Sequence, residues 1–348
     1  MEKKTMCGVY KEFPQPGAEY RTDLPIPEVG PNDVLVQVKA TAICGTDLHI
    51  LPWTQWAADR LPLPMVFGHE FAGDIVEVGS NVTEYKVGDR VAGETHIPCN
   101  ECYMCKSNRR HNCANMKIIG VHVPGSFAEY ISFPKDCVFK LPDDIDYKMG
   151  AFLEPMGVGV HGVSAAQVKG QNVLIYGCGP IGLMAIGAAK AWGAKKIIAA
   201  DVFDAKLEVA KKMGADVVIN SKENDAVAGA IAETDGIGPD IVIDYTGNGH
   251  AINDGFKALR KNGKFVMVGL PAKNLDLNAT DAIIYKEATV IGVTGRLMYE
   301  TWDECIELLK TPGFSLEPVI GGVYPLKDFQ KAFDALFAGS PGKMLLIP

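Results

Sequence analysis

The run NVLIY at residues 172–176 leads directly into GCGPIG at 177–182, and this stretch decides the fold. An almost wholly apolar run of this length is typical of a strand buried between two layers of helices. The apolar residues that follow predict a helix over Pro180–Trp192, and the glycines permit a tight turn before it. A strand, a glycine-rich turn and a helix in this order indicate the start of a dinucleotide-binding fold.

Apolar strands and amphipathic helices continue to alternate after this stretch. Further strands are predicted at Lys196–Ala200, Val217–Ile219, Asp240–Asp244, Lys264–Val268 and Thr289–Val293. Helices are predicted between them, for example at Ala205–Met213 and Ala251–Arg260. Together these segments predict an α/β fold with a doubly wound, parallel, six-stranded Rossmann sheet.

The preceding part of the chain has another pattern. Short alternating runs such as Val34–Val38 and Asp74–Val78 lie between turn residues and predict a β-rich domain. With 348 residues, the chain exceeds the usual size of one hydrophobic core. We therefore expect a β-rich domain over residues 1–156, a dinucleotide-binding domain over 157–294, and a return to the first domain over 295–348.

The composition disfavours several classes of protein. Hydrophobic residues make up 47% and charged residues 22% of the chain, as in ordinary soluble globular proteins. The net charge of −8 disfavours a nucleic-acid partner, which requires a basic face. The sequence has no apolar run of about 18 residues and no apolar signal-peptide core at its N-terminus, so we expect no membrane contact and a cytoplasmic location.

The glycine-rich turn predicts how a nicotinamide dinucleotide binds. Its glycines let the backbone approach the pyrophosphate, and the helix N-terminus offers free N–H groups to the phosphates. Asp201 follows Gly182 by 19 residues, where an acid accepts hydrogen bonds from the adenosine ribose. A carboxylate there repels a 2′-phosphate and favours NAD over NADP, whereas a purely structural turn capped by Asp201 is the competing interpretation. The candidate cofactor residues are Gly177, Gly179, Pro180, Ile181, Gly182, Asp201, Lys206, Leu270, Thr294 and Arg296.

Four of the nine cysteines have the spacing C-x2-C-x2-C-x7-C, at Cys99, Cys102, Cys105 and Cys113. Four thiolates at such a spacing suit a closed tetrahedral zinc site, which leaves no position for a substrate. We therefore predict a structural zinc site, although an iron–sulfur cluster also uses four thiolates.

A second candidate metal site is spread along the chain. Cys44, His69, Glu70 and Glu154 offer one thiolate, one imidazole and two carboxylates, a set that can leave one zinc position open to substrate. Spacing alone does not establish this site, because a free cysteine is most often a small buried apolar residue.

The chain resembles the medium-chain dehydrogenase/reductase family over essentially its full length. The run Gly68-His69-Glu70-x2-Gly73-x5-Gly79-x2-Val82 resembles the family's zinc-alcohol dehydrogenase motif. The four-cysteine segment and the glycine-rich turn follow in the family's order. The resemblance implies a GroES-like first domain, a catalytic zinc on Cys44 and His69, and a second, structural zinc in each subunit. The further catalytic ligand, Glu70 or Glu154, stays open.

The resemblance also bears on the C-terminal segment and on assembly. It implies that the last segment folds back into the catalytic domain. It implies further that subunits pair along the edge strand Thr289–Val293, which favours a homo-oligomer, with a tetramer preferred.

Three runs resemble those of the family's threonine-oxidising members. They are Trp53-Thr-Gln-Trp56, Glu94-Thr-His96 and Gly295-Arg-Leu-Met-Tyr-Glu-Thr-Trp302. The resemblance implies oxidation of L-threonine at C3 to 2-amino-3-oxobutyrate with reduction of NAD+. It implies a proton relay through Thr46 and His49 beside Glu154, and substrate-pocket roles for Trp53, Trp56, Glu94 and His96.

Two alternatives to this function are kept. A polyol or 2,3-butanediol dehydrogenase would share the zinc and NAD chemistry and act on another secondary alcohol. A non-catalytic, NAD-binding regulatory protein is the alternative from a different class. Such a protein would be expected to lack Cys44, His69 or Glu154, and the chain has all three.

Overall fold

The computed structural model describes residues 5–348, and its contacts divide the chain into two compact units. The first unit comprises the residues up to Pro155 together with Ile320–Pro348, and the second comprises Met156–Val319. The C-terminal return therefore begins at Ile320. The sequence pattern placed its start too early, at residue 295. The intervening segment packs within the second unit, where Ser164 donates a hydrogen bond to Glu304 at 2.9 Å.

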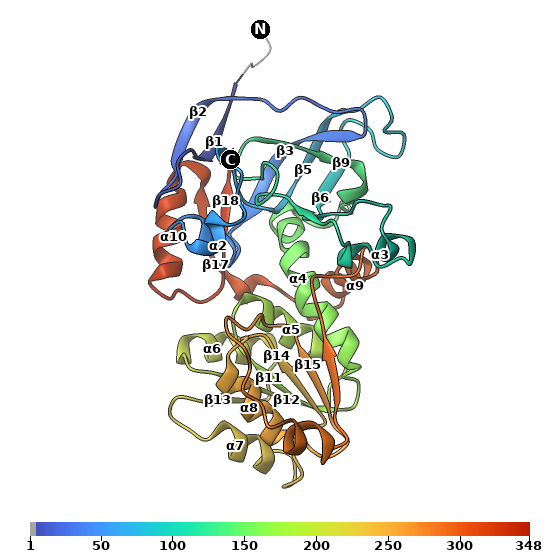
Figure 1. Ribbon diagram of the computed structural model, residues 1–348, viewed down its shortest axis with the longest axis vertical. Helices are drawn as coiled ribbons and strands as arrows, with labels where there is room; N and C mark the ends of the chain where they lie inside the picture. The colour runs from blue at the N-terminus through green and yellow to red at the C-terminus, as the bar shows by residue number, and fades with distance from the viewer. Residues whose placement is uncertain (1–4) are drawn as a thin grey trace. The chain divides into compact units, whose positions relative to one another are not determined.

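The second unit is built on a six-stranded parallel sheet of order β13-β12-β11-β14-β15-β16 (Figure 1). The strands are β11 (Asn172–Tyr176), β12 (Lys196–Asp201), β13 (Val217–Asn220), β14 (Ile241–Asp244), β15 (Lys264–Met267) and β16 (Thr289–Gly292). In chain order this is 3-2-1-4-5-6, the doubly wound Rossmann order. The predicted fold class is confirmed, and the ends of each predicted strand differ by at most one residue from those observed.

Helices connect these strands. They are α5 (Pro180–Ala191), α6 (Asp204–Met213), α7 (Ala226–Ala232), α8 (Gly249–Ala258) and, after β16, α9 (Glu300–Leu309). The start of α8 is capped by Asn248, whose side chain accepts hydrogen bonds from two backbone N–H groups. Its residue Phe256 stacks on Phe265 of β15 with ring centroids 4.0 Å apart, inside the core of this unit.

The first unit is rich in β-structure, as predicted. Its main sheet has the order β10-β6-β5-β3-β18-β17, and β9 also pairs with β3. These strands are β3 (Asp33–Ala42), β5 (Glu70–Val78), β6 (Arg90–Gly93), β9 (Tyr130–Pro134), β10 (Val138–Lys140), β17 (Ile320–Pro325) and β18 (Lys343–Ile347). Strand β18 lies between β3 and β17. The main sheet of the first unit therefore contains strands from both the N-terminal and the C-terminal part of the chain.

Smaller elements surround this sheet. The strands are β1 (Thr5–Lys11), β2 (Glu19–Pro25), β4 (Met65–Val66), β7 (His96–Ile97) and β8 (Lys117–Ile118). The helices are α1 (Asp47–Ile50), α2 (Gln55–Ala58), α3 (Tyr103–Lys106) and α10 (Phe329–Phe337). No helix among residues 5–348 is both long and apolar enough to cross a membrane.

Helix α4 (Tyr147–Ala166) was not predicted from the sequence. It contains Pro155, which has no N–H to donate, and several glycines, all of which lower helix propensity. Its apolar side chains Phe152, Leu153 and Val160 are wholly buried. Tertiary burial therefore outweighs local propensity in this segment.

Candidate metal centres and cofactor site

The four cysteines predicted to bind a structural zinc gather around the short helix α3. In this cysteine lobe (Cys99, Cys102, Cys105 and Cys113), all sulfur atoms lie within 4.8 Å of one another. The Cys102 sulfur is 3.5 Å from that of Cys105 and 3.9 Å from that of Cys113. Sulfurs at about 2.3 Å from a tetrahedral zinc are about 3.8 Å apart, so the spacing in the lobe fits a zinc ion.

The cysteine lobe holds two kinds of thiol. Hydrogen bonds from the backbone N–H groups of Cys105 and Ala114 lower the pKa of the Cys102 thiol to about 6. Burial, in contrast, raises the pKa of Cys105 to about 12. Because zinc binds thiolates, Cys102 is better prepared than Cys105 to become the first ligand of an incoming ion.

A second group of ligand atoms comes from separate segments of the first unit. The Cys44 sulfur, a His69 ring nitrogen and a Glu70 carboxylate oxygen lie within 4.8 Å of one another and form the Cys44 cluster. Cys44 stands between β3 and α1, and Glu70 is the first residue of β5. Gly68, with a φ of 87°, turns the chain ahead of His69 where the Phe127 ring leaves no room for a side chain.

The Cys44 cluster is buried and charged. Lys343 of β18 donates a hydrogen bond to Glu70 Oε1 at 2.5 Å, and the two side chains are only 4% and 0% exposed. Burial raises the pKa of the Glu70 carboxyl, and the charge of Lys343 opposes that rise. Asp47 Oδ2 accepts a hydrogen bond from the Cys44 backbone N–H at 2.8 Å, which fixes the loop that carries the thiol.

Unpaired polar atoms in this region fit a bound cation. Within residues 5–348, His69 Nδ1, Glu70 Oε2 and Asp47 Oδ1 are buried without a hydrogen-bond partner. Buried polar atoms are normally paired, so three such atoms in one place require an explanation. An ion held by the thiolate, the imidazole and the carboxylate supplies one, since these are the usual zinc ligands.

Glu154 is buried beside the Cys44 cluster, at 6% exposure. Burial is the main cause of the raised pKa of the Cys44 thiol, and the charges of Asp47 and Glu154 add to it. The Glu154 carboxylate is nevertheless not among the three ligand atoms that meet within 4.8 Å. The geometry thus groups Glu70 with Cys44 and His69, and leaves Glu154 close enough to influence their charge.

Sequence reasoning missed two residues of this site. Asp47 has a local signal, because it follows Cys44 by three residues and its carboxylate closes the turn on the Cys44 N–H. Lys343 has only a weak signal, as the one charged residue of the strand KMLLI, and its partner Glu70 is 273 residues away in the chain.

Residues predicted to handle the proton and the substrate lie on two segments of the first unit. Thr46 precedes α1, and His49 is exposed on α1 with its ring centroid 5.9 Å from that of Trp56. On the other segment, Glu94 is fully buried. Its Oε1 lies 2.8 Å from both the Nδ1 and the backbone nitrogen of His96. A carboxylate only accepts, so Nδ1 is the donor in this hydrogen bond.

The glycine-rich turn has the geometry that a pyrophosphate requires. Gly177 has a φ of 93°, and a Cβ on Gly182 would lie 1.9 Å from the Gly177 carbonyl oxygen. Gly179 is the N-cap of α5, and a Cβ there would meet only open space. Pro180 and Ile181 then begin the helix. The first and third glycines therefore shape the turn, and the second leaves room for a phosphate to approach.

Asp201 is the last residue of β12 and is connected to that turn. Its Oδ2 accepts a hydrogen bond from the Cys178 N–H at 2.8 Å, and its Oδ1 accepts one from the Val202 N–H at 2.8 Å. Lys206 lies nearby, with Nζ 4.8 Å from the centroid of the Phe203 ring. These residues occupy the carboxyl edge of the sheet, where doubly wound folds bind their ligands.

Leu270, Thr294 and Arg296 follow strands β15 and β16. Leu270 is 86% exposed and Thr294 is exposed, as residues that contact a cofactor can be before it binds. Arg296 is only 1% exposed, with its guanidinium carbon 5.8 Å from the centroid of the Trp302 ring. It is packed inside the second unit, and its contact with a cofactor stays a prediction.

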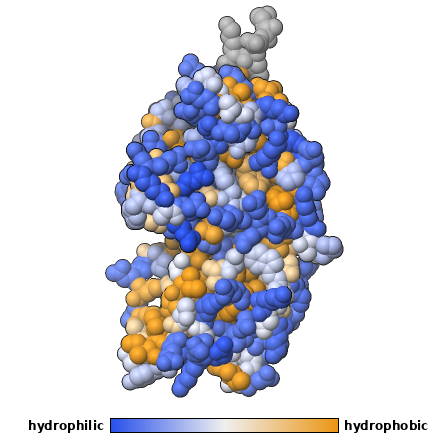
Figure 2. Space-filling model, turned by 90° about the vertical axis from the view of Figure 1, so that its right-hand side faces the viewer, coloured by the Kyte–Doolittle hydropathy of each residue, from blue (hydrophilic) through white to orange (hydrophobic). Residues whose placement is uncertain are grey.

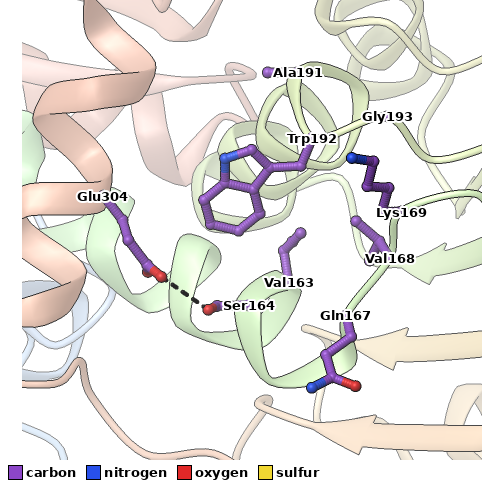
Figure 3. A pocket seen from close by; sticks show the side chains of 9 residues that line it. All are labelled: Val163, Ser164, Gln167, Val168, Lys169, Ala191, Trp192, Gly193 and Glu304. Atoms are coloured by element: carbon purple, nitrogen blue, oxygen red, sulfur yellow. Dashed lines mark hydrogen bonds between the residues drawn. The ribbon is translucent and has the colours of Figure 1, made fainter.

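A cavity of about 580 Å³ in the second unit lies away from this cofactor edge (Figure 3). Val163, Trp192 and Glu304 line it, and burial raises the pKa of the Glu304 carboxyl. The lining residues Gln167–Lys169 and Gly193 precede β11 and β12. The cavity is therefore at the amino end of the parallel strands, opposite the glycine-rich turn.

Comparisons with known proteins agree with this geometry. Residues 30–143 match the family of the alcohol dehydrogenase GroES-like domain, and residues 180–311 match the family of zinc-binding dehydrogenases. The chain belongs to the zinc-dependent medium-chain alcohol dehydrogenase family, and the predicted resemblance is confirmed. It is an oxidoreductase of a family that uses zinc and a nicotinamide cofactor.

Particular relatives narrow this class. The chain is 41% identical over 344 residues to the L-threonine 3-dehydrogenase of Caldanaerobacter subterraneus subsp. tengcongensis, covering 99% of each chain. Its fold is similar to that of galactitol-1-phosphate dehydrogenase from Escherichia coli, with a TM-score of 0.90, 31% identity, and coverage of 99% and 100% of the two chains. The same values hold for a zinc-binding dehydrogenase of Sinorhizobium meliloti 1021 bound to NADP.

Proposed function

We propose that the protein oxidises L-threonine at C3 to 2-amino-3-oxobutyrate, with NAD+ as the hydride acceptor. The observation that carries this proposal is the 41% identity to an L-threonine 3-dehydrogenase over 99% of both chains. The intact Cys44 cluster and the runs Trp53–Trp56 and Glu94–His96 support it further.

The residues around the cluster have distinct tasks in this reaction. When bound, zinc supplies Lewis acidity that makes a substrate hydroxyl easier to deprotonate, and NAD+ takes up the hydride. Thr46, two residues after Cys44, accepts the hydroxyl proton and passes its own to His49. His49 is exposed, and an imidazole can release a proton to solvent near neutral pH. Glu154, buried beside the cluster, is the alternative to Glu70 as the carboxylate ligand.

His96 recognises the substrate in this proposal. Threonine carries an ammonium and a carboxylate at neutral pH. The buried Glu94 accepts a hydrogen bond from His96 Nδ1 and so fixes the orientation of the imidazole toward the substrate. Trp53 and Trp56 form an apolar wall beside it. A polyol has no ammonium charge, so the carboxylate of Glu94 beside His96 favours an amino alcohol.

Asp201 selects the cofactor in this proposal. Its carboxylate stands at the end of β12, where it accepts hydrogen bonds from the adenosine ribose and repels a 2′-phosphate. Lys206 reaches the same ribose. We therefore propose NAD+ for this chain, although a similar dehydrogenase is known with NADP bound.

The chain is proposed to act as a cytoplasmic homo-oligomer, with a tetramer preferred. Strand β16 is an edge of its sheet, and Val290 on it is 40% exposed. The nearby Ile284 and Tyr285 are 63% and 68% exposed. Figure 2 shows hydrophobic residues exposed in patches among hydrophilic ones on one face of the molecule. An exposed apolar edge strand is a typical place for subunits to pair.

A polyol or 2,3-butanediol dehydrogenase is the second candidate function. The similarity to galactitol-1-phosphate dehydrogenase favours it, because the two chains superimpose over their whole length. A non-catalytic NAD-binding protein would bind the dinucleotide and turn over neither kind of substrate.

One assay tests these candidates together. The zinc-loaded protein is given NAD+ or NADP+ with L-threonine, D-threonine, sorbitol or 2,3-butanediol, and formation of the reduced cofactor is followed by absorbance. We expect preferential turnover of L-threonine with NAD+. Turnover of a diol or polyol alone would keep the zinc and NAD chemistry and rule out the threonine assignment, and binding without turnover would exclude both enzymes.

A further inference from the structure

Lys11, the last residue of β1, carries an ammonium group that the first unit encloses completely, at 0% exposure. Its Nζ donates hydrogen bonds to the carbonyl oxygens of Gln15, of Gly17 at 2.5 Å and of Leu51 at 3.2 Å. The three donors of the ammonium thus meet three neutral acceptors. Burial lowers the pKa of Lys11 to about 8. A buried cation held by carbonyls alone is costly, so its place in the fold indicates a specific task.

The three carbonyls belong to two separate segments. Gln15 and Gly17 lie in the loop between β1 and β2, whereas Leu51 is the C-cap of α1. The Gly17 N–H also donates to the Leu51 carbonyl, at 2.8 Å. The loop is therefore joined to the end of α1 by a side-chain bond and a backbone bond that share one acceptor.

Trp53 is held by the same ammonium. Nζ of Lys11 lies 5.3 Å from the centroid of the Trp53 ring, within the range of a cation–π contact. Trp53 has a φ of 57°, in the left-handed region that is unfavourable for a residue other than glycine. Its neighbours must maintain that conformation, and Lys11 is a charged residue among them.

The segment around Trp53 also bears the proposed relay. Thr46 and His49 precede Trp53 on this segment, and Trp56 follows it with its ring beside that of His49. Asp47 fixes the start of the segment through the Cys44 N–H, and Lys11 fixes its end through Leu51 and Trp53.

We propose that Lys11 is a positioning residue for substrate binding, which holds Trp53 and the wall formed by Trp53 and Trp56 where the substrate requires it. The proposal rests on the proposed function, since it takes this wall to face the substrate. It predicts an effect on binding and little effect on the chemical step, because the Cys44 cluster is fixed independently by Asp47 and Lys343.

Lys11→Met removes the charge and keeps most of the side-chain length. We expect KM for L-threonine to rise about ten-fold with kcat changed less than about two-fold, the pattern of lost uniform binding. Lys140→Met is the matched control, because Lys140 is a 62% exposed lysine of the same unit that pairs with Asp89 at 3.2 Å. It should leave both constants unchanged.

A double variant tests whether Lys11 acts through Trp53. If it does, Lys11→Met should raise KM little further in a Trp53→Leu background, since coupled residues are not additive. Lys11→Arg keeps the charge, so we expect a smaller rise in KM than in Lys11→Met. Some rise should remain, because the planar guanidinium cannot reach three separate carbonyls. This variant serves as the test if the methionine variant does not fold. Independent, multiplying effects or a fall in kcat alone would overturn the proposal.

A readout without substrate separates this inference from the proposed function. Acrylamide quenching of tryptophan emission should increase in Lys11→Met, and the increase should disappear in the double variant. If L-threonine is not turned over but quenching still increases, the function fails and the link between Lys11 and Trp53 stands. Unchanged quenching in a folded Lys11→Met protein would overturn the link itself.

Discussion

The cysteine lobe and the Cys44 cluster lie in the same unit and are built in opposite ways. The lobe takes all its ligands from residues 99–113. Its Cys99 and Cys102 are half-buried, as Cys44 is, and its Cys105 and Cys113 are buried. The Cys44 cluster takes its ligands from a loop and the start of a distant strand. It also encloses the ion pair of Glu70 and Lys343, which are 0% and 4% exposed.

This difference determines what each site can do. Four thiolates fill the coordination of a zinc ion, so the lobe can hold its own chain segment together and bind no substrate. One thiolate, one imidazole and one carboxylate leave a position open, and charges act more strongly in a buried site. We therefore propose a stabilising role for the lobe and a catalytic role for the cluster.

The largest expected effect separates the two groups by these roles. Cys44→Ala should lower kcat/KM at least about 1,000-fold, because a tenfold change corresponds to about 1.4 kcal/mol and Lewis-acid activation is worth several kcal/mol. Its thermal midpoint should stay near that of the parent. Cys113→Ala should instead lower the thermal midpoint by several degrees and leave the kcat of the folded protein nearly unchanged.

Three measurements are made on each variant. Formation of the reduced cofactor gives kcat and KM, thermal melts give the midpoint, and zinc analysis gives the number of ions bound. Each variant is expected to lose one of two zinc ions per subunit. Full activity in Cys44→Ala, or a Cys113→Ala protein that loses activity while keeping its thermal midpoint, would show that the roles are assigned wrongly.

The same contrast explains what could be predicted from the sequence. The Rossmann strands were placed within one residue of their ends because each apolar run lies between a turn and a helix. Helix α4 was not predicted because Pro155 and the glycines lower its local helix propensity. Burial of its apolar side chains stabilises the helix all the same. The return to the first unit was placed too early, because the packing of Arg296 and α9 is a tertiary property.

The two metal sites also differ in how far local sequence predicts them. The spacing of the lobe's cysteines predicts a site by itself, and the structure brings all four together. Spacing could not establish the Cys44 cluster, and the resemblance to a family supplied what it lacked. Neither route indicated Lys343, because its contact with Glu70 exists only once β18 has joined the sheet.

A smaller effect is expected from Lys343, which tests whether buried charge matters to the Cys44 cluster. Lys343→Met removes the cation that opposes the raised pKa of Glu70, so this carboxyl should hold its proton to higher pH and bind metal less well. We expect zinc affinity at the cluster to fall about 10- to 100-fold, as is usual for residues that support metal ligands.

Competition with a chromophoric chelator measures that affinity for the parent and the variant. Lys39→Met is the control, because it removes a partly exposed cation of the same unit that pairs with Asp74 at 3.6 Å. It should leave the zinc affinity of the cluster unchanged. Zinc retention in the lobe should not change in either variant. An unchanged affinity at the cluster in Lys343→Met would mean that Glu70 is not a ligand whose charge depends on Lys343.

The smallest expected effect concerns the thiols themselves and sharpens the contrast between the surroundings of Cys102 in the lobe and of Cys44 in the cluster. Backbone hydrogen bonds lower the pKa of Cys102 to about 6, whereas burial raises the pKa of Cys44. In protein freed of zinc by a chelator, Cys102 is therefore a thiolate above about pH 6, where an ordinary thiol with a pKa near 8.5 is still protonated.

Alkylation by iodoacetamide, read for each cysteine by peptide mass spectrometry from about pH 5 to about pH 9, checks this order of reactivity. The rate at Cys102 should rise up to about pH 6 and then level off, while Cys105 and Cys44 stay slow across the range. In the urea-unfolded chain all three should share one profile, because the hydrogen bonds and the burial are gone. A Cys102 rate that kept climbing to the highest pH would mean that its backbone hydrogen bonds do not prepare it for zinc, and the two sites would then not differ in the readiness of their thiols.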